Sequence, residues 1–201
     1  MYSVIVFDLG NVLIPFDYSI VINKLNQIKP GTGDKFERLY RENYHIHREF
    51  EKGNITREDF LSTIIEWTDH AVTKEQFCKI YSSVFTLNQK VIGLLSRLKK
   101  NYKLCLLSNT NEIHEELGYS HYDFLKEFDR LFLSYKVGAV KPEKKIYKAV
   151  EEYTQKPSYE HLFIDDILEY VEGAKNCGWD AIQFTGYDEL VRELKARKII
   201  F

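Results

Sequence analysis

Polar side chains that could do chemistry stand directly after three apolar segments of this chain. They are Asp8 after residues 4–7, the pair Ser108-Asn109 after residues 103–107, and the pair Asp165-Asp166 after residues 161–164. An uninterrupted apolar run is typical of a strand buried on both faces, as in parallel sheets. Ligands of such sheets bind beyond the carboxyl ends of the strands, so all three groups are expected to face one crevice. A turn or a helix cap explains each group singly, whereas their joint occurrence favours a shared site.

These residue types together suit phosphoryl transfer. Asp8 and the late acidic pair concentrate negative charge, which is costly unless a cation neutralises it, and carboxylate oxygens suit Mg²⁺. The Ser108 hydroxyl and adjacent amide N–H groups, such as that of Asn109, can hold phosphate oxygens. Lys141 could neutralise the negative charge of the transferred phosphoryl group, or could be a solvated surface cation. With a metal screening the charges, Asp8 could attack phosphorus and form an aspartyl-phosphate that water hydrolyses.

The elements that must position these groups follow an alternating order from residue 87 onward. Predicted strands alternate with predicted helices, which favours right-handed crossovers and a parallel sheet. The strands are expected at 103–107, 130–133, 161–164 and 181–184. The principal helices are expected at 89–100, at 142–153 with Pro142 in the first turn, between the Asp165-Asp166 pair and residue 176, and at 187–197. The expected fold class is α/β, with a Rossmann-like parallel sheet at its core.

Between the first strand and this alternating region lies a segment without any predicted strand. Apolar residues at helical spacing predict helices at 18–28 and 34–51, the second ending at Gly53. Two further helices begin with capping-box patterns at Thr56 and Thr73. We therefore expect an all-helical cap at 17–86, inserted into a core made of 1–16 and 87–201.

Composition places few further constraints on function. The chain has 201 residues, 44% of them hydrophobic, and a formal net charge of -2, so no long-range attraction to nucleic acid or an anionic membrane is expected. Its 3 cysteines show no metal-site or redox spacing. No signal segment and no apolar run of roughly 20 residues is present. We expect a cytoplasmic protein with a small phosphorylated substrate; its oligomeric state is not indicated.

Four ordered motifs resemble those of haloacid dehalogenase-like hydrolases. They are Asp8-Leu9-Gly10-Asn11-Val12, Leu106-Leu107-Ser108-Asn109, Val140-Lys141-Pro142 and Phe163-Ile164-Asp165-Asp166. The form of the first motif and the stretch 50–55 look most like the bacterial α-D-glucose-1-phosphate phosphatase group. The resemblance implies that Asp8 is the nucleophile, that Ser108 and Lys141 bind phosphoryl oxygens, and that Asp8, Asp165, Asp166 and the Gly10 carbonyl hold Mg²⁺.

Gly10 departs from the pattern of most phosphatases of this superfamily, which carry a second Asp there as the general acid and base. Such catalysis contributes about 10²- to 10⁴-fold, or roughly 3 to 5 kcal/mol of barrier. A sugar released from its anomeric phosphate is a hemiacetal and would need this help least. His45 or His47 in the cap could alternatively supply the proton, although positions two apart do not share a helix face.

Two smaller features also bear on the substrate. Tyr170 stands where many relatives carry Asn, and aromatic and polar cap residues such as Tyr40, Tyr44 and Arg48 could line a pocket or simply pack. Three functions remain open: Mg²⁺-dependent hydrolysis of a small phosphate monoester, metal-free dehalogenation by the same nucleophile, and ligand binding without catalysis. The acidic pair favours the first of these, because it calls for a metal.

Overall fold

Five parallel strands form the central sheet in the computed structural model, which describes residues 1–201. The strand order is β3-β2-β1-β4-β5, so β1 is central and receives a neighbour on each side. The strands are β1 (Val4–Phe7), β2 (Lys103–Ser108), β3 (Arg130–Leu133), β4 (His161–Asp165) and β5 (Asp180–Gln183). The predicted α/β class with a Rossmann-like parallel sheet is confirmed, and each predicted strand is present within a residue or two.

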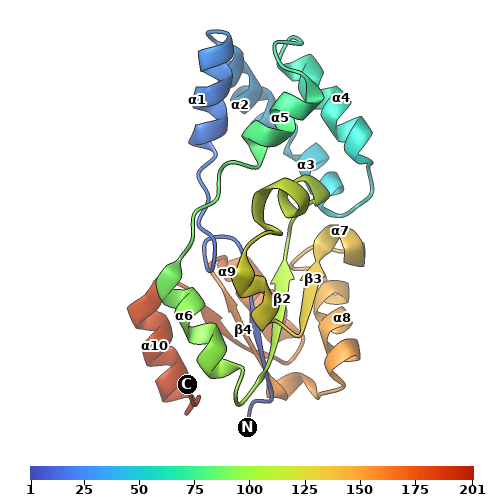
Figure 1. Ribbon diagram of the computed structural model, residues 1–201. Helices are drawn as coiled ribbons and strands as arrows, with labels where there is room; N and C mark the ends of the chain where they lie inside the picture. Colours follow the sequence, from blue (N-terminus) through green and yellow to red (C-terminus); the bar gives the residue numbers. More distant parts are fainter.

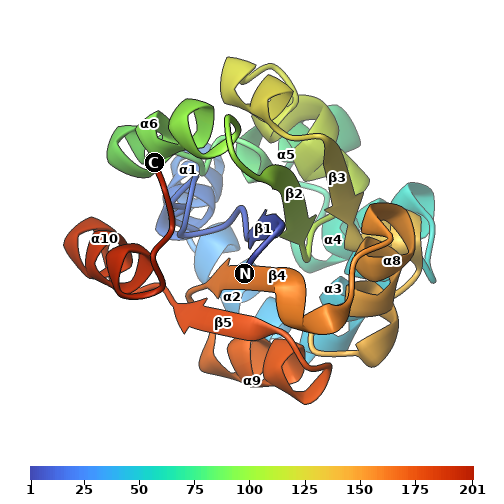
Figure 2. The ribbon, with the colours of Figure 1, turned by 90° about the horizontal axis from the view of Figure 1, so that it is seen from below.

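Helices cover both faces of this sheet, which explains why its strands are apolar throughout. Along β1, Ile5 and Phe7 enter one apolar cluster, while Val4 and Val6 enter another on the opposite face. Figure 2 shows helices on both sides of the sheet. The first face packs against α6 (Gln89–Leu98) and α10 (Tyr187–Ala196), and the second against α8 (Lys144–Thr154) and α9 (Leu168–Asn176). The sheet is thus buried from both sides and leaves only its strand ends open for a site.

Five further helices gather beyond the carboxyl ends of the strands, at the opposite end from both termini (Figure 1). They are α1 (Ser19–Ile28), α2 (Thr32–Glu42), α3 (Tyr44–Glu51), α4 (Arg57–Trp67) and α5 (Lys74–Tyr81). Their buried apolar side chains form a third cluster, separate from the two on the sheet. Both predicted capping boxes are present, at Thr56 and Thr73. These helices therefore have a core of their own above the sheet edge.

The prediction of one helix over 34–51 was wrong, because the chain breaks at Asn43. Asn43 has φ -119° and ψ 33°, outside the helical region, and its side-chain amide donates to the carbonyl of Leu39 at 2.9 Å. Asn competes in this way with the backbone bonds of a helix. The break gives five helices instead of the predicted four and reorients α3, which carries several residues of the pocket described below.

Other differences concern short elements. The sequence also predicts helical stretches at about 112–117 and 122–128, and the structure forms a π-helix at His114–Tyr119 and a 3₁₀-helix at Asp123–Glu127 there. A one-turn helix, α7 (Ser134–Val137), and a 3₁₀ turn at Ser158–Glu160 were not predicted. Pro142 lies before α8 instead of within its first turn, and its peptide bond to Lys141 is cis. None of the helices is long and apolar enough to span a bilayer.

Close packing of α1 on α2 depends on Gly33, and we predict that Gly33→Ala destabilises the protein. A Cβ atom at this position would lie 2.0 Å from the Ile22 carbonyl oxygen, so the two helices would have to separate, at a cost of about 1–3 kcal/mol. Gly93→Ala is the matched control, because Gly93 is helical and has no neighbour within 4 Å of its added Cβ. Urea unfolding should show a lower midpoint for Gly33→Ala and a raised one for Gly93→Ala; equal midpoints would refute the packing argument.

Candidate active site

A buried lysine joins two of the predicted carboxylates at the end of the sheet. Asp8 follows β1 and Asp165 ends β4, so the central pair of strands places them side by side. The Nζ atom of Lys141 lies 2.7 Å from Asp8 Oδ1 and 2.6 Å from Asp165 Oδ2. Lys141 is 1% exposed and Asp165 0%, which excludes the alternative of Lys141 as a solvated surface cation. The site therefore contains an ion-paired triad held out of water.

The third acid completes a cluster of hard oxygen donors. Asp8, Asp165 and Asp166 each offer a carboxylate oxygen, and these oxygens all lie within 4.8 Å of one another. Both oxygens of Asp165 already have partners: Oδ2 pairs with Lys141, and Oδ1 accepts from the backbone N–H of Ile167 at 2.8 Å. Asp166 is only half-buried, and its Oδ2 accepts from the Asn11 amide at 3.1 Å. Asp8, Gly10 and Asp166 line the open pocket, whereas Asp165 lies behind them.

Ser108 and Asn109 end β2 beside this cluster, but their side chains differ in availability. The Asn109 side chain holds the backbone of Lys141, accepting from its N–H at 2.7 Å and donating to its carbonyl at 3.2 Å. The Ser108 hydroxyl lines the pocket and has only a long contact of 3.4 Å, to the Asn109 carbonyl. In this arrangement the Asn109 amide positions Lys141, while the Ser108 hydroxyl is available to a ligand.

The electrostatics of this cluster favour a further cation. Burial raises the pKa of Asp8 to about 8, against the opposing effect of Lys141. Burial also raises the pKa of Asp166. For Lys141, burial acts to lower the pKa, but Asp165 and Asp8 outweigh it and hold the pKa above its usual value. Three carboxylates thus share one lysine. Since their oxygens are the donors that Mg²⁺ prefers, the residues present fit a magnesium ion.

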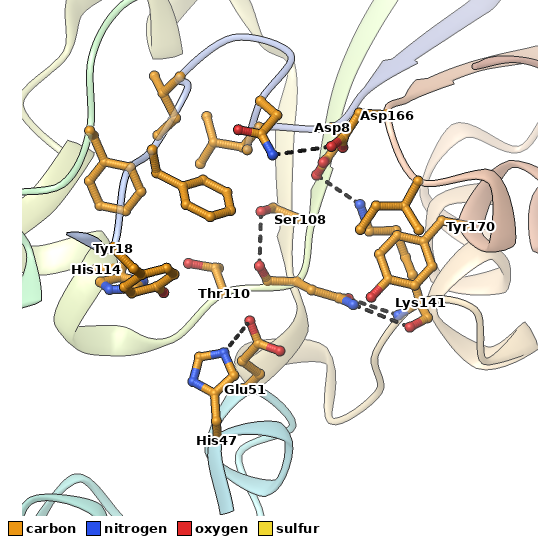
Figure 3. Close-up of a pocket in the computed structure, with 18 of the residues that line it drawn as sticks. Asp8, Tyr18, His47, Glu51, Ser108, Thr110, His114, Lys141, Asp166 and Tyr170 are labelled. Carbon is orange, nitrogen blue, oxygen red and sulfur yellow. Dashed lines mark hydrogen bonds and ion pairs between the residues drawn. The ribbon is translucent and has the colours of Figure 1, made fainter. Parts of the chain in front are cut away.

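The cluster opens into a pocket of about 340 Å³ that extends from the sheet edge to the helices above it (Figure 3). This volume lies at the lower end of the range for small-molecule sites. The sheet side contributes Asp8, Gly10, Ser108, Asn109, Lys141 and Asp166, and the helical side contributes Tyr18, Tyr40, Tyr44, His47, Arg48 and Glu51. All sequence-predicted site residues except Asp165 line this pocket. The aromatic residues Tyr40 and Tyr44 line the pocket and also pack against each other.

A polar network in α3, which sequence reasoning missed, connects the helices to the lysine loop. Glu51 is buried and pairs with His47 at 3.2 Å and with Arg48 at 3.0 Å. Arg48 also donates to the Lys141 carbonyl at 3.0 Å and lies 3.4 Å from the Tyr170 hydroxyl. Burial acts to raise the pKa of Glu51, but His47 and Arg48 outweigh it and hold the pKa below its usual value. Two sequence signals were available: Glu51 stands four residues after His47 and three after Arg48, the spacing of helical pairs, and it lies within the stretch 50–55 already noted for its family resemblance.

Neither of the two α3 histidines that the sequence offered as proton donors is placed to protonate a leaving group. His45 is exposed and lies outside the pocket. His47 lines the pocket, but its Nε2 pairs with Glu51 and its Nδ1 lies 3.1 Å from the Tyr81 hydroxyl. Both ring nitrogens are therefore occupied. The general acid missing at Gly10 has no imidazole replacement in α3.

Comparisons with known proteins agree with this geometry. A 27% identical relative is the D-ribitol-5-phosphate phosphatase of Bacteroides thetaiotaomicron, matched over 91% of this chain and 92% of that protein. A haloacid dehalogenase-family enzyme from the same organism, crystallised as a magnesium complex, superposes with a TM-score of 0.82 at 28% identity over 95% of this chain and 98% of that one. Its complex with magnesium and inorganic phosphate gives a TM-score of 0.80 at 28% identity, over 94% and 99%.

A family model covers most of the chain. The haloacid dehalogenase-like hydrolase model matches residues 2–178, which include all four motifs singled out in the sequence. The motifs lie on the strand ends and loops that form the buried cluster and the pocket. By sequence, fold and the arrangement of these motifs, this chain belongs to the haloacid dehalogenase-like hydrolase family.

Proposed function

We propose that this protein is a Mg²⁺-dependent phosphatase that hydrolyses a small phosphate monoester through an aspartyl-phosphate on Asp8. The observation that carries the proposal is the convergence of three carboxylates within 4.8 Å around the buried Lys141. A dehalogenase nucleophile displaces halide without a metal, so it does not need a cluster of three carboxylates that calls for a further cation. The similarity to a sugar-alcohol phosphate phosphatase and to a magnesium- and phosphate-bound relative supports the same reading.

The metal would be held by Asp8, Asp166 and the Gly10 carbonyl at the pocket wall, with Asp165 behind them. Bound there, Mg²⁺ would neutralise carboxylate and phosphate charge and act as a Lewis acid. Lys141 is fixed by Asp8 and Asp165, and its backbone is held by Asn109 and Arg48. A lysine fixed in advance can stabilise the developing charge without reorganising.

Asp8 is suited to attack phosphorus because Lys141 bonds only one of its oxygens, Oδ1. The attack forms a bond from the Asp8 carboxylate to phosphorus and breaks the bond from phosphorus to the ester oxygen, which leaves with the bonding electrons and takes a proton from water. The Ser108 hydroxyl can donate to a phosphoryl oxygen during this step. Water then cleaves the acyl phosphate, which releases inorganic phosphate and restores Asp8.

The missing acid at Gly10 bears on the substrate. Because neither His45 nor His47 can replace it, leaving groups that depart with little help should be favoured. The hemiacetal of a sugar 1-phosphate meets this condition. We therefore propose sugar 1-phosphates as the preferred substrates. Sugar-alcohol phosphates are the second class to test, because the 27% identical relative is named for one of them.

We also propose that residues 17–86 act as a cap over a core made of 1–16 and 87–201. The helices of this segment have their own apolar cluster, and Tyr40, His47 and Glu51 form one wall of the pocket. The contact from Arg48 to the Lys141 carbonyl joins the two parts at the reacting centre. A small substrate would thus be enclosed between them.

Phosphate release from a panel of sugar 1-phosphates, sugar-alcohol phosphates and other small esters tests this function. We expect turnover with Mg²⁺, loss with EDTA and recovery when Mg²⁺ is restored, because the carboxylate cluster needs its cation. Haloacids serve as the second panel, with halide release as the readout. Metal-independent halide release would favour a dehalogenase, and binding of esters without any turnover would favour a non-catalytic protein.

A further inference from the structure

Two residues that line the pocket each carry a buried polar atom without a hydrogen-bond partner. The Tyr40 hydroxyl and His114 Nε2 make no hydrogen bond within the protein, and both residues line the pocket. Most buried polar groups in folded proteins are hydrogen-bonded, so each exception calls for an explanation. Figure 3 shows His114 on the side of the pocket away from Asp8, Asp166 and Lys141. Tyr40 packs against Tyr18, which lies beside His114. Both residues therefore lie on the side of the pocket toward which the leaving group of a phosphate ester would extend.

The proton of the His114 ring can be assigned from its neighbour Asn111. The Asn111 Oδ1 accepts from the His114 backbone N–H at 3.0 Å, which turns the amide Nδ2 toward His114 Nδ1 at 3.2 Å. Because an amide nitrogen only donates, Nδ1 must accept, and the ring proton is on Nε2. Burial lowers the pKa of His114 to about 3, so the ring is neutral. His114 thus carries an unpartnered Nε2–H donor in the wall of the pocket.

No unpaired cation accompanies these donors. Lys141 is paired with Asp8 and Asp165, and Arg48 is paired with Glu51. Glu51 adds a buried carboxylate to the same region. A second phosphate or a carboxylate on the leaving group would therefore meet a negative charge and no free positive one. An uncharged leaving group with hydroxyl oxygens would satisfy both donors.

We propose that Tyr40 and His114 determine specificity by donating hydrogen bonds to hydroxyl oxygens of an uncharged, polyhydroxylated leaving group. This inference rests on the proposed phosphatase function, since it assigns the part of the substrate beyond the phosphate. It gives the two residues a role in recognition and none in proton transfer: the neutral His114 ring is not an acid, and burial holds the pKa of Tyr40 well above its usual value.

Ribitol 5-phosphate and pentyl phosphate form a pair of probes that separates recognition from chemistry. Both esters release a primary alcohol with five carbons, so they differ in the hydroxyl groups alone. We expect the wild type to favour ribitol 5-phosphate in kcat/KM. Tyr40→Phe should reduce this preference about three- to tenfold, the loss of one neutral hydrogen bond, by lowering kcat/KM for ribitol 5-phosphate more than for pentyl phosphate. Tyr159→Phe, at an exposed tyrosine outside the pocket, is the matched control.

His114 is tested with two replacements and the same ratio. His114→Gln keeps a side-chain N–H of similar reach and should keep most of the preference, whereas His114→Leu should lose it. Tyr40→Phe removes an unpartnered hydroxyl, so the thermal midpoint of this variant should not fall. If His114→Leu does not fold, the ratio measured for Tyr40→Phe is the test of the inference. An unchanged ratio in Tyr40→Phe would overturn the inference.

Binding separates failure of this inference from failure of the proposed function. The dissociation constants of both probes for Asp8→Asn with Mg²⁺ give the same comparison without turnover. A preference for ribitol 5-phosphate that falls on adding Tyr40→Phe supports the inference even if the wild type proves inactive. Turnover of both esters with equal affinity for them overturns the inference and leaves the phosphatase function intact.

Discussion

Asp8→Asn should abolish phosphate release, with a loss of kcat on the order of 10⁴-fold or more, comparable to losses seen when a catalytic nucleophile is removed. The amide cannot form the acyl phosphate, while its size and position are nearly those of the carboxylate. Lys141 keeps its bond to Asp165, so the pocket should remain formed. The fold should also tolerate the change, because the buried charge of Asp8 is costly.

Three measurements make this prediction specific. Mass spectrometry of acid-quenched wild-type enzyme should show one added phosphoryl group, which Asp8→Asn should not acquire. Asp123→Asn, which makes the same change at an exposed carboxylate, should keep wild-type turnover. Asp8→Asn should keep its urea midpoint. Residual activity within tenfold of wild type, with no trapped phosphoryl group, would remove Asp8 from the role of nucleophile.

The strand ends could be predicted because their signals are local. An apolar run followed at once by Asp8, or by Asp165 and Asp166, needs only a parallel sheet to bring these acids together, and the alternation of helices and strands predicts that sheet. The capping boxes that begin at Thr56 and Thr73 are likewise local, because each depends on residues within four consecutive positions. In such places the sequence pattern and the tertiary structure point to the same answer.

Tertiary contacts determined what the sequence could not show. Lys141 is a buried partner of two carboxylates only because the loop before α8 folds back to the ends of β1 and β4. The Asn109 amide is occupied by that same loop. His114 and Glu51 look unremarkable in sequence, since their importance comes from the absence of a partner in one case and from two partners in the other. The helical spacing of Glu51 with His47 and Arg48 is visible in the sequence, whereas the burial of Glu51 and the missing partner of His114 are not.

Lys141→Met should be the most destabilising of the single substitutions considered for this site. It leaves Asp8 and Asp165 buried without their shared counter-charge, and breaking a buried ion pair in this way costs about 3–5 kcal/mol. Phosphate release should be lost as well, because the fixed positive charge at the phosphoryl group is gone. Lys175→Met is the matched control. Lys175 is half-exposed and pairs only with Glu172 on the helix surface, so its removal should change stability little.

The pH dependence of this loss distinguishes an uncompensated charge from lost packing. The pKa of Asp8 is raised by burial in the folded protein, and without Lys141 it should rise further. The folded state then binds more protons than the unfolded state above the ordinary Asp pKa, so stability falls as pH rises through that window and returns as pH falls. Below pH about 8, Asp8 is largely protonated in both folded proteins, so their stabilities fall in parallel there. Urea unfolding in EDTA should therefore show a larger deficit for Lys141→Met at pH about 9 than at pH about 5. Added Mg²⁺ should recover part of the deficit at the higher pH, because it supplies the missing positive charge. A deficit that is constant with pH and unaffected by Mg²⁺ would mean that Lys141 stabilises the site by packing alone.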